Sequence, residues 1–231
     1  VGPAALTRLG AALADDATER RVRIQIPRTL QMFESQLAAD ALLDCLRSGE
    51  GGLLRYKALR ALGRLVADFE AKVDTPRMRL LARGELVEHA RLLGLREALA
   101  ALSIPDDDAA RDVHALAVRL LDDKAKQSLE RAFRAIKLCF PTEDLHRVHD
   151  VAMHGDAAAR ANAAEFLDAL LAPQGGPKRQ REDGLRQLLR VVIDQLAPAE
   201  RVSRVSVMTG IAAPPNGPAA LERLAGDADP M

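Results

Sequence analysis

Residues 51–65 read GGLLRYKALRALGRL, and two other stretches repeat this pattern of an arginine beside a stripe of apolar residues. They are residues 20–30, RRVRIQIPRTL, and residues 157–168, AAARANAAEFLD. When the stretches are aligned on one arginine, apolar residues stand one position before it and three and seven positions after it. These offsets follow the turn of a helix, so each stretch is predicted to form an amphipathic helix with its arginine at the edge of the apolar stripe. The aligned arginines, which we expect to set the register between repeats, are Arg23, Arg55 and Arg160.

A second helix is predicted in front of each of these stretches, over residues 3–16, 35–49 and 142–156. Short turns containing glycine or aspartate separate the two helices, and an aspartate there is expected to cap the helix that follows. The first two arginines are 32 residues apart, and the third follows 105 residues later. Because 105 residues is about three further units of the same size, the spacing is typical of an α-solenoid of stacked helix pairs.

The composition predicts an all-α protein. Ala, Leu and Arg, which favour helices, dominate the 231 residues, whereas the chain has no Trp, one Tyr and five Phe. The net charge is zero, so no field of the whole molecule draws it to nucleic acid or to a membrane. No uncharged apolar run approaches the roughly 20 residues that cross a bilayer.

Cys45 and Cys139 lie far apart among apolar neighbours, so both are expected to be small buried side chains rather than a disulfide. That usage suits a reducing compartment. The chain lacks a basic and apolar leader at its start and begins without Met, which we interpret as a piece of a longer protein.

The sequence resembles the HEAT-repeat family, whose second helix reads apolar-Arg-x-x-Ala-x-x-x-Leu after a turn containing aspartate; LRYKALRALG at 54–63 matches this closely. The resemblance implies a right-handed superhelical stack of antiparallel helix pairs. Residues 20–30 depart from the pattern at Pro27, which should kink that helix.

We interpret residues 1–231 as a single HEAT-like domain, with clear repeats at 3–33, 35–68 and 142–172. Residues 69–141 and 177–231 are interpreted as degenerate repeats, the last of them truncated; a separate helical insert is the alternative for 69–141. There a long helix is predicted with Thr75 as its N-cap, followed by two helices broken near Asp122 and Asp123.

The sequence of residues 1–172 is also similar to the soluble HEAT-repeat region of certain bacterial transporter-like proteins. Those proteins have major-facilitator or ATP:ADP-translocase-type membrane domains. The similarity is carried by IPRTL, RYKALRALGRL, ERAFRAIKL and RANAAEFLDALL. It implies a cytoplasmic module tethered to the inner membrane in the full-length protein, with a protein partner or adjacent domains of the parent chain bound to it.

No pattern for catalysis, a cofactor or a metal stands out. The G-x-S-x-G, P-loop and G-x-G-x-x-G patterns are absent. His146, His149 and His154 are close together with Asp150, but they lack zinc-protease spacing and are expected to be surface residues. Asp106, Asp107 and Asp108 are expected to cap and stabilise the start of the next helix. The chain is therefore predicted not to be an enzyme.

Basic residues lie on the predicted second helices opposite their apolar stripes. Stacked repeats would align them into a basic concave groove that attracts an acidic protein segment, a phosphorylated ligand or a nucleic-acid backbone; the alternative is an ordinary solvated face. The predicted groove residues are Arg21, Arg28, Lys57, Arg60, Arg64, Lys126, Arg134 and Lys137.

These observations favour a non-catalytic interaction or regulatory scaffold. A stand-alone nucleic-acid-binding or DNA-repair protein is the alternative; it is disfavoured because HEAT-like DNA glycosylases hold DNA with aromatic side chains, and this chain has no Trp and one Tyr. A bilin-lyase-like enzyme has no residue in its favour. The truncated last repeat predicts an exposed apolar edge and a weak dimer through it.

Overall fold

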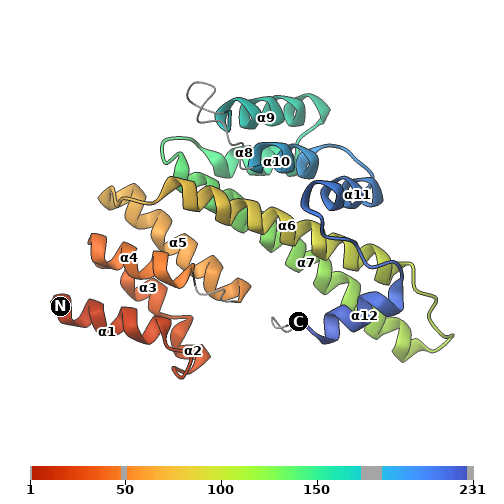
Figure 1. Cartoon of the computed structure of the whole chain (residues 1–231), viewed down its shortest axis with the longest axis horizontal. Helices are drawn as coiled ribbons and strands as arrows, with labels where there is room; N and C mark the ends of the chain where they lie inside the picture. Colours follow the sequence, from red (N-terminus) through yellow and green to blue (C-terminus); the bar gives the residue numbers. More distant parts are fainter. Residues whose placement is uncertain (1, 48–50, 173–183, 228–231) are drawn as a thin grey trace. The chain divides into compact units, whose positions relative to one another are not determined.

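The structure is a computed structural model that describes residues 2–47, 51–172 and 184–227, and the described residues form helices and no strand (Figure 1). The chain is therefore all-α, as predicted. Two compact units are present: one contains residues 1–79 and 133–145, and the other contains residues 80–132 and 146–231. Whether the chain is a single repeat domain with the predicted repeat boundaries stays a prediction.

The first unit holds the first two predicted helix pairs. Its helices are α1 (Pro3–Ala14), α2 (Arg20–Arg23), α3 (Ile26–Leu30), α4 (Gln36–Cys45) and α5 (Gly52–Phe69). Helix α4 packs on α1 and α5, and α3 packs on α5. Leucines at helical spacing fill the space between them because each helix is apolar on one face only, and Leu13, Leu30, Leu42 and Leu62 are fully buried.

Pro27 interrupts the helix of residues 20–30, as predicted. Helix α2 ends at Arg23 and α3 begins at Ile26. The proline ring lacks an N–H and crowds the carbonyl four residues earlier, which belongs to Arg23.

Helix α5 ends in a left-handed cap: Glu70 takes the left-handed conformation (φ 55°), and the N–H of Ala71 donates to the carbonyl of Leu65 at 3.1 Å.

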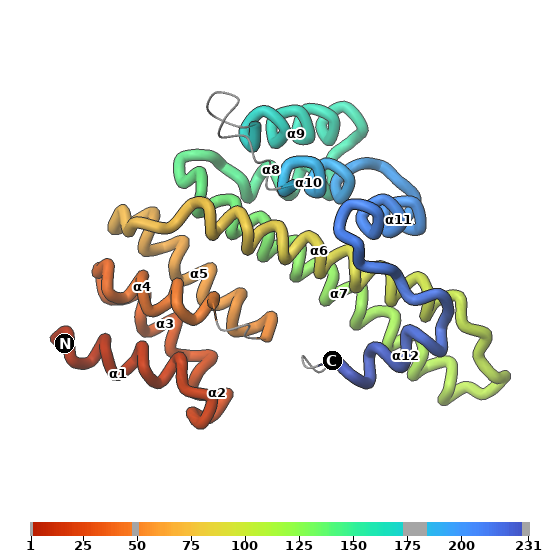
Figure 2. Tube along the Cα trace, viewed as in Figure 1, coloured from red at the N-terminus to blue at the C-terminus, as the bar shows by residue number. Residues whose placement is uncertain are grey.

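Helices α6 (Thr75–Ala100) and α7 (Asp108–Cys139) contribute residues to both units. In the second unit they run side by side in opposite directions (Figure 2). Three contacts fix their register: His89 with the carbonyl of Ala125 (2.8 Å), His114 with the carbonyl of Leu99 (2.8 Å), and Arg96 Nε with Asp122 Oδ1 (3.2 Å).

Two predictions about these helices are wrong. Helix α7 is continuous through Asp122 and Asp123, because aspartate costs a helix only a few tenths of a kcal/mol without a proline or glycine beside it. Here Asp122 also pairs with Arg96 of α6. Helix α6 begins one residue earlier than predicted, so that Asp74 rather than Thr75 accepts from the N–H of Arg77 (3.3 Å).

The second unit is completed by α8 (Leu145–His154), α9 (Ala157–Leu170), α10 (Leu185–Ile193), α11 (Pro198–Thr209) and α12 (Gly217–Ala225), of which Leu145 belongs to the first unit. Asp156 caps α9 by accepting from the N–H of Ala159 (2.8 Å), and Asp107 accepts from the N–H of Ala110 at the start of α7 (2.9 Å). Both aspartates therefore have the capping role that the sequence predicts. Within the described ranges, no helix combines the length and apolar character needed to cross a membrane.

Candidate functional site

The outer face of α5 carries three basic side chains. Arg60 and Arg64 are exposed and Lys57 is half-buried, while Leu54, Ala58 and Leu62 on the opposite face are buried. None of the three basic side chains has an ion-pair partner in the part of the chain that the structure describes. Like charges three and four positions apart repel by a few tenths of a kcal/mol per pair, so a bound anion would relieve a cost that the helix now carries. We call Lys57, Arg60 and Arg64 the α5 basic face.

The first pair of helices supplies two further predicted groove residues. Arg28 on α3 is exposed and has no ion-pair partner among the described residues. Arg21 on α2 is exposed as well, but its Nε lies 2.6 Å from Glu19 Oε1. Of these two, only Arg28 therefore offers an uncompensated charge.

The predicted groove residues of α7 are occupied by contacts of their own. The Arg134 guanidinium lies over the Tyr56 ring, 4.7 Å from its centroid, and donates to the Tyr56 hydroxyl at 3.2 Å. Lys137 donates to the carbonyls of Pro141 and Glu143. Lys126 belongs to the second unit and lies 3.8 Å from Asp123.

Charge is divided unevenly between the units. Residues 1–79 and 133–145 contain 15 Lys and Arg against 12 Asp and Glu, whereas the remaining residues contain 18 against 21. The zero net charge of the chain thus combines a basic unit with an acidic one. The α5 basic face lies in the basic unit, which strengthens its attraction for anions.

The three aligned arginines have different surroundings. Arg23 is buried, and it donates from Nε to the carbonyl of Leu13 (3.2 Å) and from Nη1 to Asp16 (3.0 Å), which fixes the turn between α1 and α2. Arg55 and Arg160 are half-buried on α5 and α9, and the Nε of Arg160 is buried without a hydrogen-bond partner in the structure. A role for all three in setting repeat register stays a prediction.

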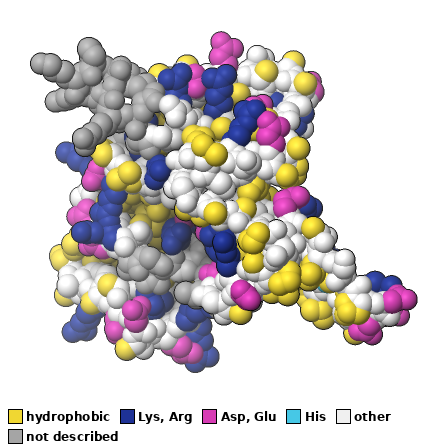
Figure 3. Space-filling model, turned by 45° about the vertical axis from the view of Figure 1, so that its right-hand side comes forward, with side chains coloured by type: hydrophobic (Ala, Val, Ile, Leu, Met, Phe, Trp, Pro, Cys, Tyr) yellow, Lys and Arg dark blue, Asp and Glu magenta, His cyan; other side chains and the backbone are white. Residues whose placement is uncertain are grey.

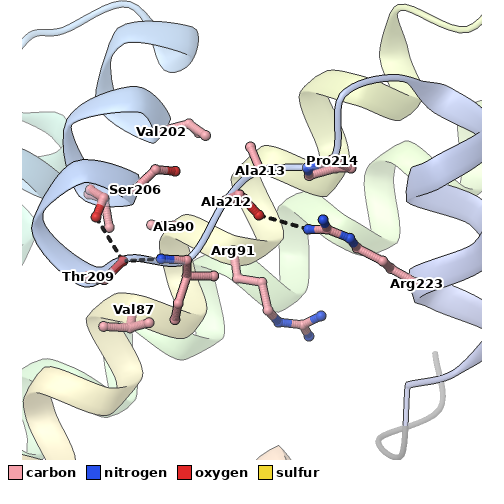
Figure 4. Close-up of a pocket in the computed structure, with 12 residues that line it drawn as sticks. Val87, Ala90, Arg91, Val202, Ser206, Thr209, Ala212, Ala213, Pro214 and Arg223 are labelled. Carbon is pink, nitrogen blue, oxygen red and sulfur yellow. Dashed lines mark hydrogen bonds between the residues drawn. The ribbon is translucent and has the colours of Figure 1, made fainter.

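A small cavity lies in the second unit between α6, α11, residues 211–214 and α12 (Figure 4). Its volume is about 20 Å³, which is room for about one water molecule and not for a metabolite. The polar groups at its rim are already used: Arg223 donates to the carbonyl of Ala212 (2.8 Å), and Arg91 pairs with Glu88 (2.6 Å) and Asp227 (2.8 Å). The hydrogen bonds that Arg91 donates to Glu88 and to Asp227 raise the pKa of its guanidinium despite its partial burial.

A buried polar cluster that the sequence analysis missed joins α6 to α7. Glu85 accepts from Arg131 Nε (2.9 Å) and from Ser128 Oγ (2.8 Å), and the side chains of Glu85 and Arg131 are 0% and 7% exposed. His89 lies one turn further along α6, and burial lowers its pKa to about 4, so it is a neutral ring that donates from Nδ1 to Ala125. The signal in the sequence was a glutamate on the apolar stripe of Met78, Ala82 and Leu86. Because water does not reach these groups, the cluster links α6 to α7 and offers no binding site.

The histidines of α8 do not form a metal site among the described residues. His154 Nδ1 lies 3.1 Å from Asp150 Oδ1, both on the exposed side of the helix. Burial is the largest effect on His149 and lowers its pKa.

Comparisons of this chain with protein-family models, with curated proteins and with solved structures find no match. The α5 basic face is the candidate functional site, on the strength of its own exposure and charge.

Proposed function

We propose that this chain is a non-catalytic interaction scaffold of HEAT-like helix pairs in a right-handed stack, and that the α5 basic face binds an acidic segment of a protein. The packing of α4 on α1 and α5 supports the scaffold role, because each helix covers its apolar stripe with its neighbours and leaves its outer face free. The similarity to transporter-associated HEAT regions makes an adjacent domain of a longer protein the preferred partner.

The observation that carries the proposal is the pair Arg60 and Arg64, exposed and unpaired in the described structure, opposite a fully buried stripe. An exposed ion pair contributes about 0.2–1 kcal/mol, so a partner needs several acidic residues in sequence to bind measurably. Binding should be weak, fast and strongly reduced by salt.

The same charges would attract the backbone of a nucleic acid, which is the alternative. Single-stranded nucleic acids usually also need an aromatic ring on which bases stack. The only tyrosine of the chain, Tyr56, lies under the Arg134 guanidinium, which leaves Phe69, 40% exposed at the end of α5, as the one exposed aromatic ring on this helix. A single ring at the helix end offers little stacking surface for a strand of bases. An acidic protein segment is therefore favoured.

The test is a fluorescence-anisotropy titration of a labelled ten-residue Glu/Asp peptide with the full chain at low salt. Arg60→Glu/Arg64→Glu should weaken binding about tenfold, since two favourable contacts become repulsive. The matched control is Arg47→Glu/Arg204→Glu, which changes the net charge equally at exposed arginines that already pair with Asp44 and Glu200. Equal loss in both variants would reduce the effect to net charge and contradict the proposal. Tighter binding of single-stranded DNA than of the peptide would favour the alternative.

A further inference from the structure

The first half of α7 exposes an apolar stripe that nothing in the described chain covers. Val113 is 68% and Leu116 is 51% exposed, and they lie in line with the exposed Ala109 and the half-buried Leu120. Residues 109, 113, 116 and 120 are separated by steps of four, three and four, which is the spacing of the residues through which two helices pack in a coiled coil. Figure 3 shows hydrophobic side chains on the projecting part of the second unit, with charged side chains at its tip, where α6 is joined to α7.

The inner face of the same helix is fully used. Ala117 and Val118 pack against the cluster that contains Leu95, Leu99 and Leu121, and His114 bonds to the carbonyl of Leu99. The exposed stripe is therefore a second apolar face of α7, because the face that packs in the core is already buried.

Two opposite charges flank the stripe on its outer side. Asp112 and Arg119 are seven residues apart, both are exposed, and neither has an ion-pair partner in the described structure. The other charges along this edge are already neutralised within the chain, since Asp108 pairs with Arg111 and Asp123 lies 3.8 Å from Lys126.

A second α7 in the antiparallel direction matches all of these positions in a single register. That register places Val113 against Leu116 of the second copy and Ala109 against Leu120 of the second copy. It also brings Asp112 beside Arg119 of the second copy, and two-fold symmetry repeats each contact. In a parallel arrangement Asp112 and its copy would lie on opposite edges of the seam, so Asp112 would not meet Arg119 of the second copy. The charges thus specify both the partner and its direction.

We propose that this chain forms a two-fold symmetric dimer in which the first halves of α7 from two copies pack antiparallel through Val113 and Leu116. One short helix pair buries less surface than the roughly 1,200–2,000 Å² of a stable interface, so the dimer is weak and concentration-dependent. This surface is distinct from the C-terminal edge and from the α5 basic face, and the proposal does not depend on the proposed function.

Sedimentation velocity of the full chain from about 5 to 500 µM tests the apolar contact. The wild type should shift from monomer to dimer over this range, and Leu116→Glu should remove the shift. The control is Val207→Glu, the same kind of change at a side chain of α11 that is 84% exposed, which should leave the dimer unchanged. A wild type that is monomeric throughout, or a dimer that survives Leu116→Glu, would overturn the proposal.

Charge reversal tests the register. Asp112→Arg and Arg119→Asp should each weaken the dimer about tenfold, because two symmetric contacts become repulsive, and the double variant should restore it. Far-UV circular dichroism should show wild-type helicity in every variant, since all the changed side chains are exposed. Additive weakening in the double variant would show that the two residues do not meet, and the antiparallel register would be wrong. If Leu221→Glu on α12 removes dimerisation while Leu116→Glu does not, the C-terminal edge is the interface.

Discussion

Removing Arg131 should destabilise the second unit far more than its position on a polar-looking helix suggests. Arg131→Met removes the cation that lies 2.9 Å from the Glu85 carboxylate, in a site where the glutamate side chain has no exposed surface, and it leaves the hydrogen bond from the Ser128 hydroxyl (2.8 Å) in place. Breaking a buried ion pair from one side costs about 3–5 kcal/mol. Because the serine bond remains, we expect about 3 kcal/mol.

The double variant Glu85→Leu/Arg131→Met distinguishes two contributions to the free energy of unfolding. One is the cost of leaving Glu85 charged and without Arg131, and the other is the net contribution of the ion pair itself. Both replacements are apolar and of similar volume, and Ser128 keeps its second acceptor, the backbone carbonyl of residue 85 at 2.9 Å. Replacing a buried pair in this way is often neutral or stabilising, so the double variant should lie within about 1 kcal/mol of wild type.

The assay is urea unfolding followed by far-UV circular dichroism, with free energies compared where the denaturant slopes agree. Arg204→Met is the control, since its exposed pair with Glu200 should be worth less than about 1 kcal/mol. A cost below about 1 kcal/mol for Arg131→Met, or a double variant less stable than Arg131→Met, would refute this account of the cluster.

Two further predictions concern single residues. Glu70→Gly should raise the free energy of unfolding by about 0.5–1 kcal/mol in the urea assay, because the left-handed conformation at φ 55° costs glycine nothing; no gain would mean that the glutamate side chain compensates for its backbone. The pKa of His89 is about 4 in the fold and near its ordinary 6.5 in the unfolded chain, so the unfolded chain binds more protons between these values. Stability should therefore fall as pH drops from about 6.5 to 4, by about 3 kcal/mol from this residue, and His89→Gln should flatten that part of the curve in urea titrations at several pH values. An unchanged slope in His89→Gln would contradict the assignment.

The sequence predicts the helices well wherever a single apolar stripe dominates. The three helix pairs predicted from the aligned arginines are helical in the residues that the structure describes, and residues 48 and 49 of the second pair lie outside them. The interruption before Pro27 follows from the chemistry of proline. The continuity of α7 was missed because adjacent aspartates resemble a turn, while the contact from Arg96 that holds Asp122 in the helix is tertiary. Propensity alone does not contain that contact.

The basic groove was predicted from the positions of Lys and Arg on the helices relative to the apolar stripes. Those positions do not show which of the charges already have a partner in the fold. Arg134 and Lys137 point the same way on a helical wheel as Arg60 and Arg64 do on theirs, yet they are tied to Tyr56 and to loop carbonyls. Glu85 was missed for the converse reason, since a charged residue is normally taken as solvated unless its partner is known, and Arg131 is 46 residues away in sequence.

The contact between Arg134 and Tyr56 gives the molecule a built-in optical reporter. With no tryptophan and one tyrosine, ultraviolet emission of the protein comes from a single phenol ring, under a guanidinium that bonds to its hydroxyl. Tyrosine emission would thus monitor α5 and the end of α7, whereas circular dichroism averages over every helix. Recording both signals on one sample would reveal whether the basic and acidic units melt together or in separate steps.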